Sequence, residues 1–205
     1  MIGAEGFVST GISNPDLQAL LERSASLHRH LCPRQVLGVR AGLYAGRLLP
    51  AEFPQTGKRI LAMVETDGCF ADGVTVASGC SMGHRTMRLA DYGKVAVTFI
   101  ETCSGRALRF SPLPDLRARA IASVAQEASR WHAYLDAYRQ LGEKDLFAVR
   151  EVSLNIDLAS VIGKPGARAV CNHCGEEILN QREVLRGEST LCPSCAGDSY
   201  WRSKG

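Results

Sequence analysis

Four cysteines near the C-terminus constrain this chain more than any other feature of its sequence. They form two Cys-x-x-Cys pairs with 17 residues between them: Cys171, Cys174, Cys192 and Cys195. Each pair can turn tightly enough for both sulfurs to reach one ion, and the separation lets the two pairs complete a tetrahedron. Two disulfides are the alternative, but nothing in the sequence suggests export. We therefore expect a closed, structural zinc site.

The segment that carries these cysteines is poor in large apolar side chains. Residues 170–205 cannot fold on a hydrophobic core alone, so metal binding must supply their stability. Glycine and proline punctuate the sequence just before, at residues 163–166. We expect two domains: residues 1–165 as an α+β domain, and residues 166–205 as a zinc-ribbon or treble-clef module.

Composition excludes several classes of protein. The 205 residues include 24 basic and 21 acidic side chains, and a net charge of +3 is too weak to argue for nucleic acid. Residues 1–10 lack a basic region followed by an apolar one, and no apolar run approaches the roughly 18 residues of a membrane span. We expect a cytoplasmic protein without a membrane partner, whose eight cysteines serve metal binding or chemistry rather than disulfides.

Hydrophobic periodicity in the first domain predicts mixed secondary structure. Helices are expected after Asn14, over residues 33–48, and as one long helix from after Pro114 to Tyr138. Strands are expected over residues 59–65, 94–100, 106–110 and 147–154, with the second and third paired as a hairpin. Three glycines spaced four apart, Gly38, Gly42 and Gly46, would let another backbone approach closely, and they suggest a homodimer.

Metal-competent side chains also gather in the first domain. His28, His30 and Cys32 lie within five residues, directly before Pro33. Because proline fits the first turn of a helix and disfavours the α conformation at the residue before it, Cys32 should occupy an N-cap position. Unpaired amide groups and the helix dipole there favour a thiolate. Two further cysteines, Cys69 and Cys80, lie in turn-rich segments after a predicted strand.

The order of several motifs resembles the FmdE family, whose members are named as a component of molybdenum or tungsten formylmethanofuran dehydrogenase. The resemblance covers roughly residues 20–155. The motifs that carry it are His28-x-His30-x-Cys32-Pro33, Leu37-Gly38-x-Arg40-x-Gly42, Glu65-Thr66-x3-Phe70-Ala71-Asp72-Gly73-Val74, Ser78-Gly79-Cys80-Ser81-x-Gly83 and Asp91-Tyr92-Gly93-Lys94-x-Ala96.

The resemblance implies an α+β fold in which a small mixed β-sheet is covered by helices, as in FwdE/GAPDH-like domains. It also implies a metal site in this domain, drawn from His28, His30, Cys32, Cys69 and Cys80. Some members carry a C-terminal zinc ribbon, which matches the tail. One departure is His84-Arg85-Thr86, where the family has a Lys-Gly-Asn-like run, so this chain places another imidazole there.

The leading hypothesis is a protein with two metal sites of different kinds. Imidazole and thiolate together suit a divalent metal such as zinc, nickel or iron. If only three groups bind, a position stays open for water or a substrate atom, and the metal acts as a Lewis acid or lowers the pKa of its water. His28 or His30 serves as ligand or general base, and Asp67 or Asp72 would orient an imidazole.

Two other functions remain open at this point. In one, the chain is a non-catalytic accessory or regulatory protein whose ribbon docks protein or nucleic acid, with a partner in a dehydrogenase or metal-handling system. In the other, Cys32 carries out thiol redox chemistry with Cys69 or Cys80, which requires Cα atoms within about 7 Å. No domain of molybdopterin-binding size is present, so whether the chain is an enzyme is left open.

Overall fold

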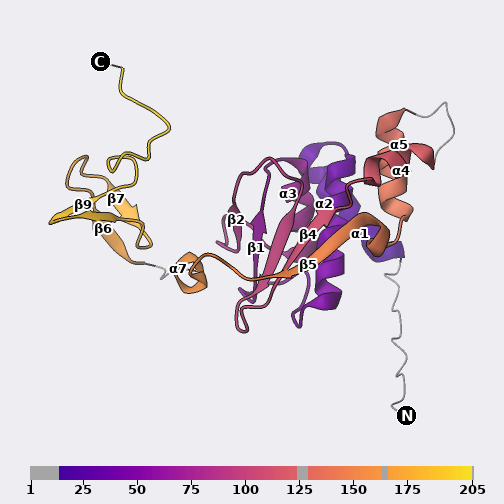
Figure 1. Ribbon diagram of the computed structural model, residues 1–205, viewed down its shortest axis with the longest axis horizontal. Coiled ribbons are helices and arrows are strands. Elements are labelled where there is room, and N and C mark those ends of the chain that lie inside the picture. The colour runs from indigo at the N-terminus through magenta and orange to yellow at the C-terminus, as the bar shows by residue number, and fades with distance from the viewer. Residues whose placement is uncertain (1–13, 124–128, 163–165, 205) are drawn as a thin grey trace, which may run out of the picture. The chain divides into compact units, whose positions relative to one another are not determined.

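The computed structural model describes residues 14–123, 129–162 and 166–204. The chain divides into two compact units, Met1–Ser153 and Leu154–Gly205, called here the N-terminal and C-terminal units (Figure 1). The predicted boundary at residue 165 stays a prediction, because residues 163–165 lie outside the described ones. Among the helices described, none has the length and apolar character to cross a bilayer.

A five-stranded mixed sheet forms the centre of the N-terminal unit, with strand order β2-β1-β3-β4-β5. β1 pairs with β2 in parallel, whereas the other neighbours are antiparallel. The strands are β1 (Ile60–Val64), β2 (Met87–Leu89), β3 (Val97–Glu101), β4 (Ala107–Pro112) and β5 (Phe147–Val152). β3 and β4 form the predicted hairpin, and the predicted α+β class with a small mixed sheet is confirmed.

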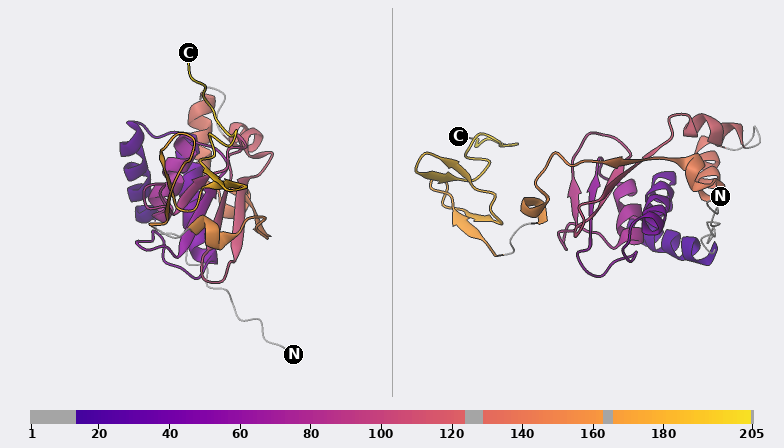
Figure 2. Two further views of the ribbon diagram at one scale, coloured as in Figure 1. Left: turned by 90° about the vertical axis from the view of Figure 1, so that its left-hand side faces the viewer. Right: turned by 60° about the horizontal axis from the view of Figure 1, so that its bottom comes forward.

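Helices lie over one face and beyond one end of this sheet, as Figures 1 and 2 show. They are α1 (Asn14–His28), α2 (Pro33–Leu48), α3 (Cys69–Ser78), α4 (Leu116–Ala122), α5 (Arg130–Gln140) and α6 (Glu143–Leu146). Alternate residues of each strand point toward the helices. Phe99 and Phe110 meet edge to face at 5.7 Å, and Tyr44 of α2 contacts Phe110 in the same way. Burial of these rings fixes the layer of helices on the sheet.

The glycine stripe of α2 is occupied by α3 of the same chain. A Cβ at Gly38 would overlap the carbonyl of Phe70 and lie 2.8 Å from the amide of Val74. Reciprocally, a Cβ at Gly73 would lie 2.8 Å from the amide of Val39 and 3.0 Å from Cα of Gly38. Two glycines therefore let the two helices cross in backbone contact. The close approach predicted from the stripe is real, but it is intramolecular and gives no support to a homodimer.

The single long helix predicted after Pro114 is wrong. α4 ends at Ala122, and α5 begins at Arg130 after an extended N-cap at Ser129 (φ −63°, ψ 149°), whose side chain accepts a hydrogen bond from the amide of His132. A capping serine interrupts helical geometry although the apolar spacing continues across it. Residues 124–128 lie outside the described part of the chain.

A buried arginine fastens the C-terminal end of α5 to α2. Arg40 is 5% exposed, and it donates to the carbonyls of Tyr138 and Arg139 at 3.0 Å and of Leu141 at 2.6 Å. Its guanidinium also lies 3.3 Å from the Glu143 carboxylate. Carbonyls at a helix end lack intrahelical partners and attract a cation. Arg40 thus determines where α5 ends and where it lies against α2.

The C-terminal unit has little apolar interior. It contains α7 (Leu158–Ile162) and two antiparallel hairpins, formed by β6 (Arg168–Val170) with β7 (Glu177–Leu179) and by β8 (Val184–Arg186) with β9 (Ser189–Leu191). Within its described residues, the buried side chains are Cys171 and Ile178. Such a core is too small to hold two hairpins together.

Candidate metal centre and ligand pocket

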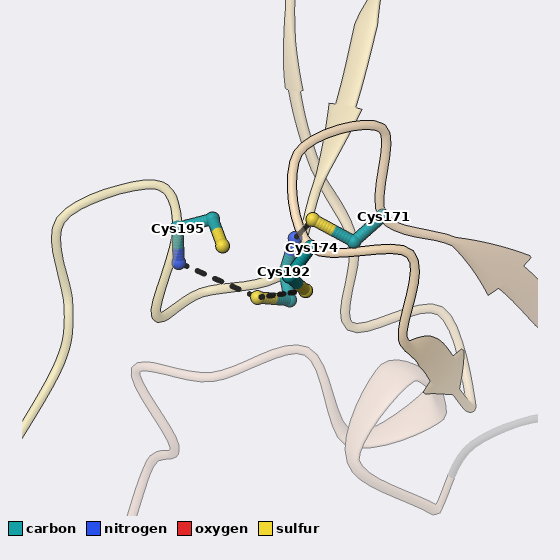
Figure 3. Close-up of side chains that lie close together, drawn as sticks. All are labelled: Cys171, Cys174, Cys192 and Cys195. Atoms are coloured by element: carbon teal, nitrogen blue, oxygen red, sulfur yellow. Dashed lines mark hydrogen bonds between the residues drawn. The ribbon is translucent and has the colours of Figure 1, made fainter. Parts of the chain in front are cut away.

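The four tail cysteines converge on one point between the hairpins (Figure 3). Their sulfur atoms, from Cys171, Cys174, Cys192 and Cys195, all lie within 4.8 Å of one another, and those of Cys174 and Cys192 are 4.0 Å apart. A tetrahedral ion with Zn–S bonds of about 2.3 Å would place its sulfurs about 3.8 Å apart. The thiols therefore fit a closed zinc site with no free coordination position.

Backbone turns aim amide groups at these sulfurs. The amide of Cys192 donates to the sulfur of Cys171, and the amide of Cys195 donates to that of Cys192, both at 3.3 Å. Gly175 and Gly197 adopt positive φ values of 76° and 106°, which residues with a side chain rarely accept. Tight turns directly after each Cys-x-x-Cys pair thus depend on the glycines that the sequence places there.

The cluster strongly separates the acidities of its thiols. Amide donors from Cys174 and Cys192 lower the pKa of Cys171 to about 6. Hydrogen bonding to Cys192, followed by burial, raises the pKa of Cys195 to about 12. Several thiolates cannot share so small a space without a cation. A divalent ion would displace the remaining protons and stabilise all four thiolates.

Two cysteines of the N-terminal unit also come together. Cys32 is the N-cap of α2, as predicted, and its amide donates to Oε1 of Gln35 at 2.8 Å. Cys69 opens α3, which crosses α2 at the paired glycines. Burial and the neighbouring thiol of Cys32 raise the pKa of Cys69, whereas the charge of Arg34 lowers it. We call Cys32 and Cys69 the thiol pair.

The thiol pair lies in the wall of a cavity of about 850 Å³, called here the cationic pocket. A cavity of this size suits a cofactor or a metabolite. Its wall combines the two thiols, four basic side chains, three aromatic residues and small or apolar residues: Cys32, Cys69, Arg34, Lys94, Arg109, Arg117, Trp131, Tyr134, Tyr138, Pro33, Leu37, Val95, Ala96, Ser111, Pro112, Leu113, Pro114 and Leu116.

Cys80, which the family resemblance placed among the metal ligands, is not gathered at the thiol pair. It follows the end of α3, so about 15 Å of helix separates its backbone from that of Cys69. It is fully buried, its thiol accepts from Nε2 of Gln55 at 3.2 Å, and burial raises its pKa. A neutral, buried thiol with its own partners belongs to the core, and Cys80 does not line the cationic pocket.

The predicted histidines and carboxylates do not complete a metal cluster with the thiol pair in the described structure. His30 is exposed, and the side chain of His28 lies outside the described residues. Asp67 and Asp72 line a different hollow, of about 250 Å³, beside β1 and β2. Among the described side chains, the tail cysteines form the one group of three or more close metal-ligating atoms. A second metal site therefore remains a prediction.

Sequence reasoning missed the wall of the cationic pocket. Trp131 and Tyr138 belong to the apolar periodicity that predicted the long helix, which faces a core, yet Trp131 is 42% exposed; Tyr134 lies outside that periodicity. Arg34, Lys94 and Arg117 come from three separate segments, and no local motif relates them. In the tail, His173 was also missed, and its Nδ1 lies 3.5 Å from the sulfur of Cys195.

The fold and its sites define the class of protein: an α+β domain with a pocket beside two thiols, joined to a four-cysteine zinc finger. The chain belongs to the FmdE family, because the family model described as FmdE, Molybdenum formylmethanofuran dehydrogenase operon, matches residues 27–148. A second model, the prokaryotic dksA/traR C4-type zinc finger, matches residues 166–200. The tail therefore contains a four-cysteine zinc site, as expected.

Two similar proteins place this combination in context. The crystal structure of an FmdE-like protein from Syntrophus aciditrophicus, named for tungsten formylmethanofuran dehydrogenase, superposes with a TM-score of 0.60 at 21% identity, covering 98% of this chain and all of that one. A protein of Archaeoglobus fulgidus named probable S-adenosyl-L-methionine-binding protein is 29% identical over 211 residues. The match covers 92% of this chain but 56% of that protein, so the chain spans little more than half of it.

Proposed function

We propose that the N-terminal unit binds a second divalent metal, zinc, nickel or iron, at the thiol pair, and presents it to a small molecule in the cationic pocket. The observation that carries this proposal is the contact between the thiols of Cys32 and Cys69 in the wall of that cavity. Borderline metals bind thiolates, so a divalent ion at this site would displace the proton that the raised pKa of Cys69 retains. His28 or His30, at the end of α1, would add an imidazole.

The proposed site differs from the zinc finger in openness. The two thiols with one imidazole would give three protein ligands, one fewer than the four of the tail. A metal held by fewer than four protein ligands keeps a position for water or a ligand atom, where it acts as a Lewis acid. The chain's own contribution is to hold the two sulfurs on helices fixed by Gly38 and Gly73.

Metal stoichiometry of the purified full-length chain tests this proposal. We expect two metal ions per chain in the wild type and one in the Cys32→Ser/Cys69→Ser double variant, because the tail site is untouched. Cys103→Ser is the matched control, since Cys103 is an exposed cysteine in the β3–β4 turn and lines neither site. One ion per chain in wild type and double variant alike would refute a metal at the thiol pair.

Thiol redox chemistry is a second candidate, favoured by the same contact between Cys32 and Cys69. Without metal, the pair would lose two hydrogens to a thiol oxidant such as diamide and form a disulfide. Bound metal would protect it, so mass spectrometry after diamide treatment of metal-loaded and metal-stripped protein separates the two functions. Cys80 is not expected to take part, because α3 separates it from Cys69. The homodimer and a protein partner in a dehydrogenase or metal-handling system remain predictions.

A further inference from the structure

The cationic pocket carries an excess of positive charge. Its described wall includes Arg34, Lys94, Arg109 and Arg117, and none of its residues is an aspartate or a glutamate. Arg109 is already neutralised, because it holds Glu65 through two hydrogen bonds of 2.6 and 2.7 Å. Three cations therefore remain whose charge no carboxylate of the wall offsets.

The other contacts of these three cations are to neutral groups. Burial raises the pKa of Tyr138 and the nearby charge of Arg117 lowers it in part, and Nζ of Lys94 lies 5.8 Å from the ring centroid of Tyr92. Arg34 is near enough to Cys69 to lower its pKa. Among the ion pairs of the described residues, none involves Arg34, Lys94 or Arg117. Like charges lining one concavity raise the local concentration of anions.

Aromatic rings supply a second recognition element. The rings of Tyr134 and Tyr138 stack at 5.9 Å with 11° between their planes, and both residues line the pocket. Trp131, one helical turn before Tyr134, also lines it and is partly exposed. Tyr138 is buried and supports the ring of Tyr134, so the exposed indole of Trp131 and the half-buried phenol of Tyr134 are the faces that could contact a planar ring, and neighbouring cations bind a phosphate or carboxylate.

We propose that the cationic pocket binds an organic anion that carries a planar ring and a phosphate or carboxylate group. The anion lies against the unpaired cations, and the ring lies against the aromatic residues of α5. This inference rests on the proposed function only in that both use the same cavity. It requires no metal at the thiol pair, so each can fail alone.

The same charge argument disfavours, for this pocket, the ligand in the name of the Archaeoglobus fulgidus protein. S-adenosyl-L-methionine carries a sulfonium and an ammonium against one carboxylate, so it enters a positive pocket at an electrostatic cost. We therefore assign S-adenosyl-L-methionine no place in the cationic pocket.

Binding of small molecules that share a planar ring system but differ in charge tests the proposal on the full-length chain. AMP, adenosine and S-adenosyl-L-methionine share one planar base and sugar, and 2-naphthoate with 2-naphthol forms the matching carboxylate pair. By calorimetry, we expect at least one anion to bind about tenfold tighter than its neutral partner, as one or two charged hydrogen bonds would give. A preference for AMP over adenosine would identify the anionic group as a phosphate, and a preference for 2-naphthoate over 2-naphthol would identify it as a carboxylate. No preference in either arm, or tightest binding of S-adenosyl-L-methionine, would overturn the proposal.

Variants of the wall locate the binding. Arg117→Gln and Arg34→Gln should each weaken the preferred anion about fivefold or more while leaving its neutral partner unchanged. Lys58→Gln is the matched control, because Lys58 is exposed and does not line the pocket. Equal affinity in all three variants would place the anion elsewhere and refute the site. Arg117→Gln should weaken the anion while leaving the metal stoichiometry of the chain unchanged, which separates this inference from the metal proposal.

Discussion

The two units of this chain are stabilised in different ways. The N-terminal unit buries a continuous apolar layer between its sheet and helices, whereas the described part of the C-terminal unit buries only Cys171 and Ile178. Its hairpins are instead joined where four sulfurs meet. Where an apolar interior is missing, the free energy of metal binding becomes free energy of folding. The difference between the units can be tested by changes that affect one and leave the other intact.

Metal removal should produce the largest difference. Structural zinc contributes about 10–16 kcal/mol of apparent binding free energy in small zinc modules near neutral pH. A strong chelator should therefore unfold the C-terminal unit and expose residues 166–204 to protease, while the helical circular dichroism of the N-terminal unit persists. Protection of the tail after complete metal removal, measured by limited proteolysis, would contradict this account.

Adding a single methyl group between α2 and α3 should destabilise the N-terminal unit and leave the C-terminal unit unchanged. Gly73→Ala places a Cβ 2.8 Å from the amide of Val39 and 3.0 Å from Cα of Gly38, where only backbone can move. We expect a loss of about 3 kcal/mol in the free energy of unfolding, measured by urea denaturation. The zinc content of the tail should not change.

Gly57→Ala is the matched control for this substitution. A Cβ at Gly57 meets no atom within 4 Å, and its φ is not positive. Its stability should therefore change by less than about 0.5 kcal/mol. If both alanine variants were equally stable, the backbone contact between α2 and α3 would not be the reason for these glycines.

Two ion pairs of the N-terminal unit differ in burial and should differ in their contribution to stability. Glu65 and Arg109 form a two-bond pair with side chains 10% and 25% exposed, so Glu65→Gln should cost about 2 kcal/mol. Glu151→Gln breaks the exposed pair with Arg106 and should cost less than about 1 kcal/mol. Urea denaturation measures both values, and the reverse order would show that burial does not decide the strength of these pairs.

Acid should weaken the N-terminal unit through one carboxylate in particular. Hydrogen bonds from the side chain and amide of Ser104, with further help from Cys103 and Arg59, lower the pKa of Glu101 from 4.5 to about 2. Because the folded pKa is below the ordinary value, this carboxylate stabilises the fold above pH 4.5, and the contribution is lost as pH falls toward 2. Wild type should therefore lose more stability between pH 5 and pH 3 than Glu101→Gln, as followed by urea midpoints. Parallel pH dependences would refute this role.

Local sequence rules predicted those features that depend on neighbouring residues. α2 has the predicted bounds because Pro33 can begin a helix and Cys32 can precede it. The zinc site could be predicted because each of its two cysteine pairs has only two residues between its members. α3 and β2 were missed, since α3 begins in a glycine-containing segment that reads as a loop and β2 has three residues, too few for a periodic pattern.

The pocket could not be predicted, because it is assembled by tertiary contacts. Cys69 meets Cys32 only because α3 crosses α2 at Gly38 and Gly73, and spacing along the chain does not reveal that crossing. The family resemblance grouped Cys80 with these cysteines, although α3 holds it at the far end. The distribution of ligand-type residues in a sequence is thus informative about chemistry, while helix packing decides which of them meet.

The arginine inside α2 has a consequence for how the pocket could be adjusted. Arg40 donates hydrogen bonds to carbonyls at the C-terminal end of α5. Helix α5 also carries Trp131 and Tyr134, which line the cationic pocket. The guanidinium does not line that cavity, yet it holds the end of the helix that carries two of its aromatic residues. Substitution of Arg40, or of Glu143 beside it, is therefore expected to change the shape of the cavity without altering a residue of its wall.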